Sequence, residues 1–152
     1  MRKAFVPDKI YRRIADIDID KDIIGRGLKL AILDIDGTLK NRILRRAPKD
    51  TEKWVRECLD KRLYVALVSN DRRNRHIKFA KDLELPLIAA AHKPSPDPVR
   101  WLLKEYGVRP ADAVVIGNNP FTDVLCAHRA GVRAYWVRPI ETTKLKKRGL
   151  DG

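Results

Sequence analysis

Cysteine and long apolar runs are scarce in this sequence. Two cysteines among 152 residues, Cys58 and Cys126, are too few for a disulfide framework or a zinc cluster. No apolar run approaches the roughly 20 residues that a bilayer-spanning helix needs, and the N-terminal stretch lacks the apolar centre of a signal peptide. We therefore expect reduced thiols, a cytoplasmic location and a single domain with a core of its own.

Acidic residues are also in short supply. Lysine and arginine total 33 against 20 aspartates and glutamates, which gives a formal net charge of +13. Such an excess favours polyanionic partners, namely nucleic acid, an anionic membrane surface or a phosphorylated substrate. A basic surface without a specific partner explains the number equally well until the charges are located in the fold.

Short apolar runs alternate with helical patterns along the chain. The runs predict five strands, over residues 28–34, 63–69, 86–91, 113–117 and 133–138. Apolar residues at helical spacing predict four helices, near residues 54–59, 77–83, 99–106 and 124–130. Strict alternation of this kind favours right-handed crossovers, so the expected fold is α/β with a doubly wound, mainly parallel five-stranded sheet.

Polar residues follow four of the expected strands. In an open α/β sheet, ligands bind outside the carboxyl ends of the strands, so these are the places to inspect. The four segments read "DIDGT", "SND", "HKP" and "GNNPFTD". Together they supply a carboxylate pair, a hydroxyl, an ammonium group and an amide with an acid, a set typical of phosphoryl transfer.

These four segments, in this order and at these strand ends, resemble the four motifs of haloacid-dehalogenase-type (HAD) phosphatases. "FVPDKIYRRIADID" before the first motif and "FTDVLCAHRAGVRAYWVRPI" near the end resemble the small YqeG branch, within subfamily IIIA, a relative of mitochondrial phosphatidylglycerophosphate phosphatase. The resemblance covers nearly the whole chain. It implies a HAD-like Rossmannoid fold and a Mg²⁺-dependent phosphomonoester hydrolase that works through an aspartyl-phosphate intermediate.

The carboxylate pair of the first motif has a physical logic of its own. Positions two apart on a strand point the same way, so Asp34 and Asp36 address one substrate from one side. Two unit charges 4 Å apart interact by about 4 kcal/mol at an effective dielectric near 20, so cations must neutralise the carboxylates and the phosphate. The resemblance makes Asp34 the nucleophile and Asp36 the acid and base, with Ser69 and Lys93 acting on the phosphoryl oxygens.

The resemblance also implies the ligands of the metal and the phosphate. Mg²⁺ takes a side-chain oxygen of Asp34 and the backbone carbonyl of Asp36. Asn118 stands where the family usually has a metal-binding aspartate, so we expect weaker metal binding, with Asp123 acting through a water or by orienting Lys93. The expected phosphate-binding residues are Gly37, Thr38, Ser69, Asn70 and Lys93.

Arginines follow the first two motifs and are expected to surround the catalytic edge. They are Arg42, Arg45, Arg46, Arg72 and Arg73, with Lys40 and Arg75 close by. About a dozen residues separate the first motif from the next helix, which leaves no room for a large cap domain. We expect a lidless site for a large or surface-bound anionic substrate, such as phosphatidylglycerophosphate on an anionic membrane; a phosphorylated protein or a nucleic-acid end fits as well.

The chain is expected to divide into an N-terminal extension (1–27), a phosphatase core (28–140) and a basic tail (141–152). Isoleucines at 10, 14 and 17 predict an N-terminal helix that either packs on the sheet or lies in a membrane interface. The earlier "DIDID" is interpreted as a loop and a cap, with Asp20 capping a turn over residues 21–24. The histidines are assigned surface or core roles, with only His92, beside Lys93, of further interest.

A second hypothesis is a HAD-like scaffold with a weakened metal site that binds RNA or an assembly partner. RNA is the less favoured partner because the recognised RNA-reading motifs are missing from the sequence. The three tryptophans also lie within expected helices or strands rather than beside the arginine clusters.

Overall fold

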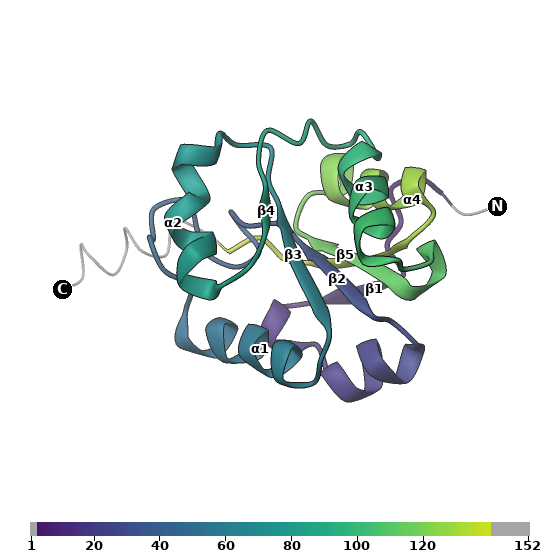
Figure 1. The fold of residues 1–152 in the computed structure, drawn as a ribbon, viewed down its shortest axis with the longest axis horizontal. Helices are drawn as coiled ribbons and strands as arrows, with labels where there is room; N and C mark the ends of the chain where they lie inside the picture. Colours follow the sequence, from purple (N-terminus) through teal and green to yellow (C-terminus); the bar gives the residue numbers. More distant parts are fainter. Residues whose placement is uncertain (1–2, 141–152) are drawn as a thin grey trace.

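The computed structural model describes residues 3–140, and these form one α/β unit (Figure 1). The strands are β1 (Lys9–Tyr11), β2 (Leu30–Leu33), β3 (Tyr64–Val68), β4 (Leu87–Ile88), β5 (Ala113–Gly117) and β6 (Arg133–Val137). The α-helices are α1 (Lys49–Asp60), α2 (Arg73–Leu83), α3 (Asp97–Tyr106) and α4 (Leu125–Ala130). The five predicted strands and four predicted helices are all present.

All strand pairs are parallel, in the order β1-β6-β5-β2-β3-β4. The predicted fold class is therefore confirmed, with six strands in place of five. β2 lies at the centre, where Leu33 is in register with Leu67 of β3 and Ile116 of β5. The carboxyl ends of β2, β3 and β5 consequently meet at one edge of the sheet, and the polar segments that follow them lie there together.

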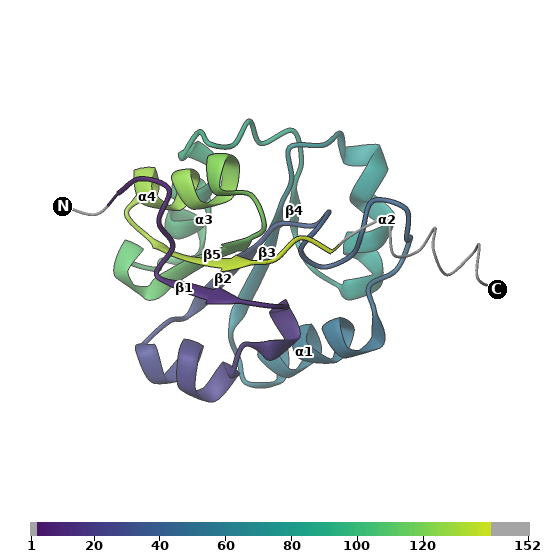
Figure 2. The same cartoon turned by 180° about the vertical axis from the view of Figure 1, so that it is seen from behind.

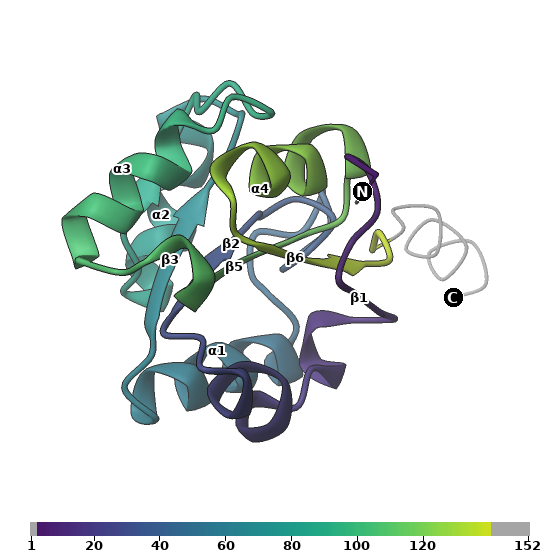
Figure 3. The same ribbon diagram turned by 90° about the vertical axis from the view of Figure 1, so that its right-hand side faces the viewer.

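Helices cover both faces of the sheet, as the strictly apolar central strands require. One core cluster joins the sheet to the N-terminal turns, α1 and α2, and includes Trp54, Phe79 and Leu83. The other joins it to α3 and α4 through residues such as Leu102 and Ala127. Figure 3 shows α3 and α4 on one side of the sheet, with α1 and the N-terminal turns on the other.

The prediction of an N-terminal helix is wrong. Lys9–Tyr11 is an edge strand that pairs with β6, Lys9 lying opposite Tyr135 (Figure 2). Ile14 and Ile17 are buried in the core, whereas Ile10 is 63% exposed. The three isoleucines do not share a face, so this segment is not a membrane-interface helix.

The "DIDID" segment is a loop and cap, but the capping residue is Asp18 rather than Asp20. Asp18 Oδ1 accepts a hydrogen bond of 2.9 Å from the backbone N–H of Lys21, at the start of the helical turn η2 (Ile19–Ile23). Asp20 instead pairs with Lys61 Nζ at 2.6 Å. The following turn η3 (Ile24–Arg26) ends at Gly27, whose φ of +77° favours glycine.

No cap domain interrupts the described part of the chain. Only a loop connects β2 to α1, and only α2 and β4 separate β3 from Lys93. Within residues 3–140, every helix is too short or too polar to cross a bilayer. The division into extension, core and tail stays a prediction, since residues 141–152 lie outside the described residues, although β1 makes the N-terminal segment part of the sheet.

Candidate active site

A cavity of about 490 Å³ opens at the carboxyl ends of β2, β3 and β5. Most of the expected site residues line it: Asp34, Asp36, Gly37, Ser69, Asn70, Lys93 and Asn118. Pro139 and Ile140, which the sequence did not single out, also line it, and the Ile140 N–H donates to the carbonyl of Gly37 at 2.9 Å. The topology therefore brings residues from four motifs and the end of the described chain to one place.

Lys93 links two carboxylates at the base of this cavity. Its ammonium group donates to Asp123 Oδ1 at 2.6 Å, to Asp34 Oδ1 at 3.0 Å and to the carbonyl of Val68 at 2.9 Å. Burial alone would lower the pKa of Lys93, but the charges of Asp34 and Asp123 outweigh it and raise that pKa above its usual range. Lys93 is therefore a fixed positive charge beside the predicted nucleophile.

The pKa of Asp34 is raised to about 6. Burial is the largest cause and the nearby charge of Asp123 the next, while Lys93 acts in the opposite direction. At neutral pH the carboxylate is still mostly ionised, as a nucleophile must be. Its second oxygen, Oδ2, accepts a hydrogen bond from the Thr38 hydroxyl at 3.3 Å.

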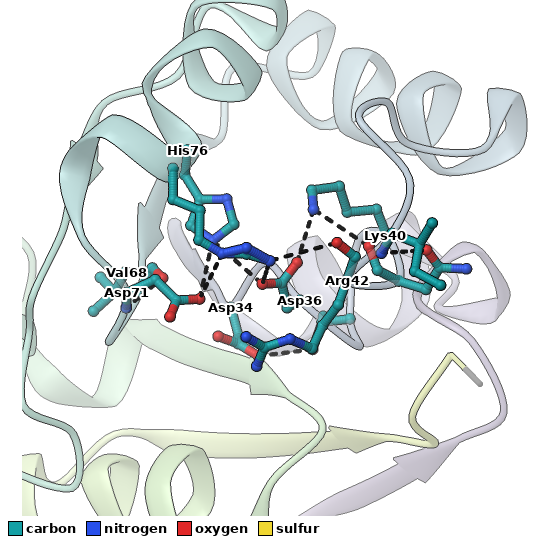
Figure 4. Close-up of polar contacts among 12 residues, drawn as sticks. Asp34, Asp36, Lys40, Arg42, Val68, Asp71 and His76 are labelled. Carbon is teal, nitrogen blue, oxygen red and sulfur yellow. Dashed lines mark hydrogen bonds and ion pairs between the residues drawn. The ribbon is translucent and has the colours of Figure 1, made fainter. Parts of the chain in front are cut away.

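Asp36 lies among three basic groups (Figure 4). Lys40 Nζ is 2.8 Å from Oδ1, while Arg75 Nη2 and His76 Nε2 are 3.1 and 3.4 Å from Oδ2. Burial raises the pKa of Asp36, but hydrogen bonds from His76 and Lys40 outweigh it and hold that pKa well below its usual range. Asp36 is thus ionised in this arrangement and has no proton to donate, whereas the acid role that the resemblance implies requires its protonated form.

Sequence reasoning missed the groups around Asp36. Lys40 was interpreted as a loop cation, yet it is only 4% exposed and its ammonium lies 5.8 Å from the centre of the Phe79 ring. His76 is completely buried, with Nε2 at 3.2 Å from Asp71 Oδ2, whereas His92 is exposed. The one signal in the sequence was the spacing of Lys40 four residues after Asp36.

The side chain of Asn70 holds the backbone of Lys93 in place. Its Nδ2 donates to the Lys93 carbonyl at 3.0 Å, and its Oδ1 accepts from the Lys93 N–H at 2.7 Å. The hydroxyl of Ser69 accepts from the N–H of Asp71 at 3.1 Å while facing the cavity. Ser69 therefore serves as a local turn cap and remains available to a phosphoryl oxygen.

Two expected phosphate ligands have other partners. The N–H of Gly37 donates to the carbonyl of Lys40 at 2.6 Å, so this amide is not free to bind phosphate. Thr38 is buried and its hydroxyl is directed to Asp34. In this arrangement the turn after β2 uses both groups to fix its own shape, and their roles in phosphate binding stay predictions.

The groups around Asn118 fit a hard divalent cation. One side-chain atom of the Asn118 amide lies 2.8 Å from Asp34 Oδ2 and 3.2 Å from the carbonyl of Asp36; without a cation it is the nitrogen, which donates to both, and the amide must turn over to present its oxygen there to a cation. Gly37 has a φ of +86°, and a Cβ there would overlap the Asn118 amide, so glycine permits this approach. A carboxylate, a backbone carbonyl and an amide oxygen are the ligand types that Mg²⁺ accepts, with one charge fewer than two aspartates would supply.

Asp123 is not placed as a direct metal ligand. Its Oδ1 faces Lys93, and its Oδ2 accepts from the backbone N–H of Asn119 at 3.2 Å. The side chain is almost fully buried against Gly117, where a Cβ would overlap its carboxyl group. Of the two alternatives from the sequence, this geometry favours the orientation of Lys93.

The predicted substrate-surface arginines do not form one ring. Arg42 lines both the catalytic cavity and a second cavity, to which Arg45 and Arg46 belong. Arg72 borders a smaller hollow beside Asp71, and Arg73 is exposed at the start of α2.

Known proteins resemble this chain in sequence and in fold. The profile of a family described as HAD-hydrolase-like matches residues 90–146. The probable phosphatase YqeG of Bacillus subtilis is 29% identical over 143 residues, which span 94% of this chain and 83% of that protein.

Solved structures agree on the fold. The cobalt-bound deoxy-D-mannose-octulosonate 8-phosphate phosphatase of Haemophilus influenzae superposes with a TM-score of 0.63 at 16% identity, covering 80% of this chain and 75% of that one. The core domain of a putative phosphoglycolate phosphatase from Streptococcus pneumoniae gives 0.56 at 16% identity, covering 82% and 97%. At such identities the likeness establishes the fold alone.

Fold and site together resemble those of HAD-type phosphatases, and the sequence matches support a hydrolase of phosphoric monoesters. The chain is YqeG-like, since its similarity to the Bacillus subtilis protein extends over nearly the whole sequence.

Proposed function

We propose that this protein is a Mg²⁺-dependent phosphomonoester hydrolase that forms an aspartyl-phosphate on Asp34. Its substrate is large or surface-bound and anionic, with phosphatidylglycerophosphate as the leading candidate. The observation that carries the proposal is the position of the Asp34 carboxylate, which faces the cavity between Lys93 and Asn118.

Charge neutralisation at the nucleophile comes from two sources. Lys93 supplies one fixed cation, 3.0 Å from Asp34 Oδ1. Mg²⁺, held by Asp34, the carbonyl of Asp36 and the side chain of Asn118, would supply the other and offset the charge of the phosphate. Asp123 and Asn70 hold Lys93 in place from its side chain and its backbone.

Asp34 attacks phosphorus as the carboxylate, and Asp36 serves as the base that deprotonates the water that cleaves the acyl phosphate. Protonation of the leaving oxygen by Asp36 in the first step requires Lys40 and Arg75 to turn away from its carboxylate. An incoming anionic substrate provides an alternative partner for both cations. The ionised state of Asp36 therefore belongs to the substrate-free protein.

The mouth of the site supports a surface-bound substrate. Ile43, 54% exposed, follows Arg42 of the cavity wall, and Phe121, 67% exposed, lies two residues after Asn119. An exposed apolar side chain beside an arginine, as at Ile43, suits peripheral contact with an anionic membrane, where each basic residue contributes about 1 kcal/mol.

The test is hydrolysis of phosphatidylglycerophosphate in anionic vesicles, beside a panel of soluble phosphate esters, with and without Mg²⁺. We expect turnover that needs Mg²⁺ and disappears in Asp34→Asn but persists in Asp60→Asn, an exposed carboxylate at the end of α1. Absence of turnover at saturating Mg²⁺, together with salt-dependent RNA binding, would favour the scaffold hypothesis instead. Trapping with beryllium fluoride and Mg²⁺ tests the intermediate, because the mimic must occupy Asp34.

A further inference from the structure

A second cavity, of about 780 Å³, lies between the loop after the first motif and helix α2. Cations dominate its wall: Lys40, Arg42, Arg45, Arg46, Arg75 and Lys78. Asp82 is the one carboxylate among the described residues that line it, and it already pairs with Lys78 at 3.3 Å. The apolar part of the wall comes from Ile43, Leu44 and Phe79.

Three of these cations have no acidic partner within the described part of the chain. No carboxylate of residues 3–140 pairs with Arg42, Arg45 or Arg46, although other surface cations of this protein, such as Arg13 and Lys61, do have such partners. Crowded like charges repel one another, and an arginine cluster is the usual protein partner of a phosphate group. The cavity is therefore electrostatically incomplete without an anion.

The cavity is preformed rather than a chance gathering of loop side chains. Asn41 is buried, and its Oδ1 accepts from the N–H groups of Ile43 and Leu44 at 3.0 and 2.8 Å, which fixes the turn of the loop. Arg75 donates to the carbonyl of Arg42 at 3.4 Å and so joins the loop to α2.

The second cavity shares a wall with the catalytic one. Lys40 lines the second cavity, while its ammonium lies 2.8 Å from Asp36, which lines the first. Arg75 also lines the second cavity and lies 3.1 Å from Asp36 Oδ2. Arg42 lines both cavities. An anion in the second cavity therefore competes with Asp36 for Lys40 and Arg75.

We propose that the second cavity is a binding site for a phosphate-type oxyanion, distinct from the phosphate that is hydrolysed. The anion is either a second phosphate group of the substrate, whose carbon part contacts Leu44 and Phe79, or a free oxyanion that acts on the catalytic cavity through Lys40 and Arg75. The inference deepens the proposed function, and its kinetic part rests on that function; its binding part does not.

The binding test uses sulfate, a tetrahedral dianion that cannot be hydrolysed, titrated at constant ionic strength and followed by ¹H–¹⁵N NMR. The backbone amides of Ile43 and Leu44 report on the second cavity, and those of Gly37 and Asn70 on the catalytic one. We expect a saturable shift at Ile43 and Leu44 that is lost in Arg46→Gln/Lys78→Gln and retained in Lys104→Gln, an exposed lysine of α3. A dispersed spectrum shows that each variant is folded.

No saturable shift at Ile43 and Leu44, or an equal shift in the double variant and the Lys104→Gln control, would overturn the proposal. Loss of turnover with every substrate, alongside an intact sulfate response, would contradict the proposed function while supporting this site.

The kinetic test distinguishes the two sources of the anion. Propane-1,3-diyl bisphosphate and propyl phosphate differ by one phosphate group. If the second group belongs to the substrate, Arg46→Gln/Lys78→Gln raises the ratio of the KM for the bisphosphate to the KM for the monophosphate by about fivefold. If the anion is free, that ratio stays as in Lys104→Gln, and added sulfate changes the kcat for propyl phosphate in the native protein but not in the double variant.

Discussion

The ammonium of Lys93 lies 2.6 Å from Oδ1 of Asp123, and both side chains are almost fully buried. Removing one partner of such a pair leaves the other charge buried with less compensation, which is more costly than replacing both. Among residues 3–140, Asp34 would then be the one carboxylate left beside Lys93.

Asp123→Asn is therefore expected to lower the free energy of unfolding by roughly 3 kcal/mol, as measured by urea denaturation without metal. Asp82→Asn removes an exposed partner of Lys78 and should cost under about 0.5 kcal/mol. Similar losses in the two variants would show that the buried pair does not stabilise the fold.

Asn118→Asp should tighten Mg²⁺ binding about tenfold, because a carboxylate replaces a neutral oxygen beside Asp34. Without metal, the added negative charge should lower the thermal midpoint, and Mg²⁺ should restore it. The measurement is the midpoint across a Mg²⁺ titration. Asn119→Asp, one residue along, is the matched control, and an Asn118→Asp titration that coincides with the control would exclude position 118 as a ligand.

The acid role of Asp36 can be separated from its other roles by the leaving group. An alkyl phosphate needs a proton on the departing oxygen, whereas p-nitrophenyl phosphate releases a stable anion. Asp36→Asn should reduce kcat for the alkyl ester by about 10²-fold or more, and for the aryl ester by much less. Asp71→Asn removes the other carboxylate beside His76 and should leave the ratio of the two rates unchanged; a ratio that is equally unchanged in Asp36→Asn would remove Asp36 from acid catalysis.

The stability of the N-terminal segment should depend on acid. The Tyr11 hydroxyl donates to Asp22 Oδ2 at 2.8 Å, and this hydrogen bond is the largest cause of the lowered pKa of Asp22. A carboxyl group whose pKa is lowered by folding adds stability above its unfolded pKa of about 4, and that stability is lost as the pH falls through the folded pKa.

Tyr11→Phe should therefore cost about 1 kcal/mol at pH 7 and progressively less below pH 4. Denaturation curves at several pH values measure this difference. Tyr64→Phe is the control, because Tyr64 stacks on Tyr106 and its hydroxyl has no hydrogen-bond partner among residues 3–140. A cost for Tyr11→Phe that does not change with pH would contradict the assignment.

The sequence predicted five of the six strands, and the polar groups that follow four of them, because both signals are local. Each buried strand is a short apolar run, and Asp34, Ser69 and Asn118 follow such runs directly. β1 escaped prediction because it reads KIY, which is not an apolar run, and because it pairs with a strand some 125 residues away, as in the contact of Lys9 with Tyr135. The spacing of Ile10, Ile14 and Ile17 is typical of a helix, but Lys9–Tyr11 forms a strand because it pairs with β6.

Within the site, the sequence predicted that Asp34 and Lys93 lie at the same edge of the sheet, where the structure has them 3.0 Å apart, but it did not predict the environment of Asp36. His76 lies on α2, and its approach to Asp36 depends on how that helix packs, which no local pattern encodes. Similarly, Gly37 and Thr38 were assigned to phosphate from their motif, whereas the closed turn engages their donors internally.

The contact between Ile140 and Gly37 limits how far the protein can be shortened from its C-terminal side. A truncation that removes Ile140 deletes part of the cavity wall together with the hydrogen bond that joins it to the turn after β2. A minimal catalytic fragment therefore has to extend past the last strand of the sheet to include this residue.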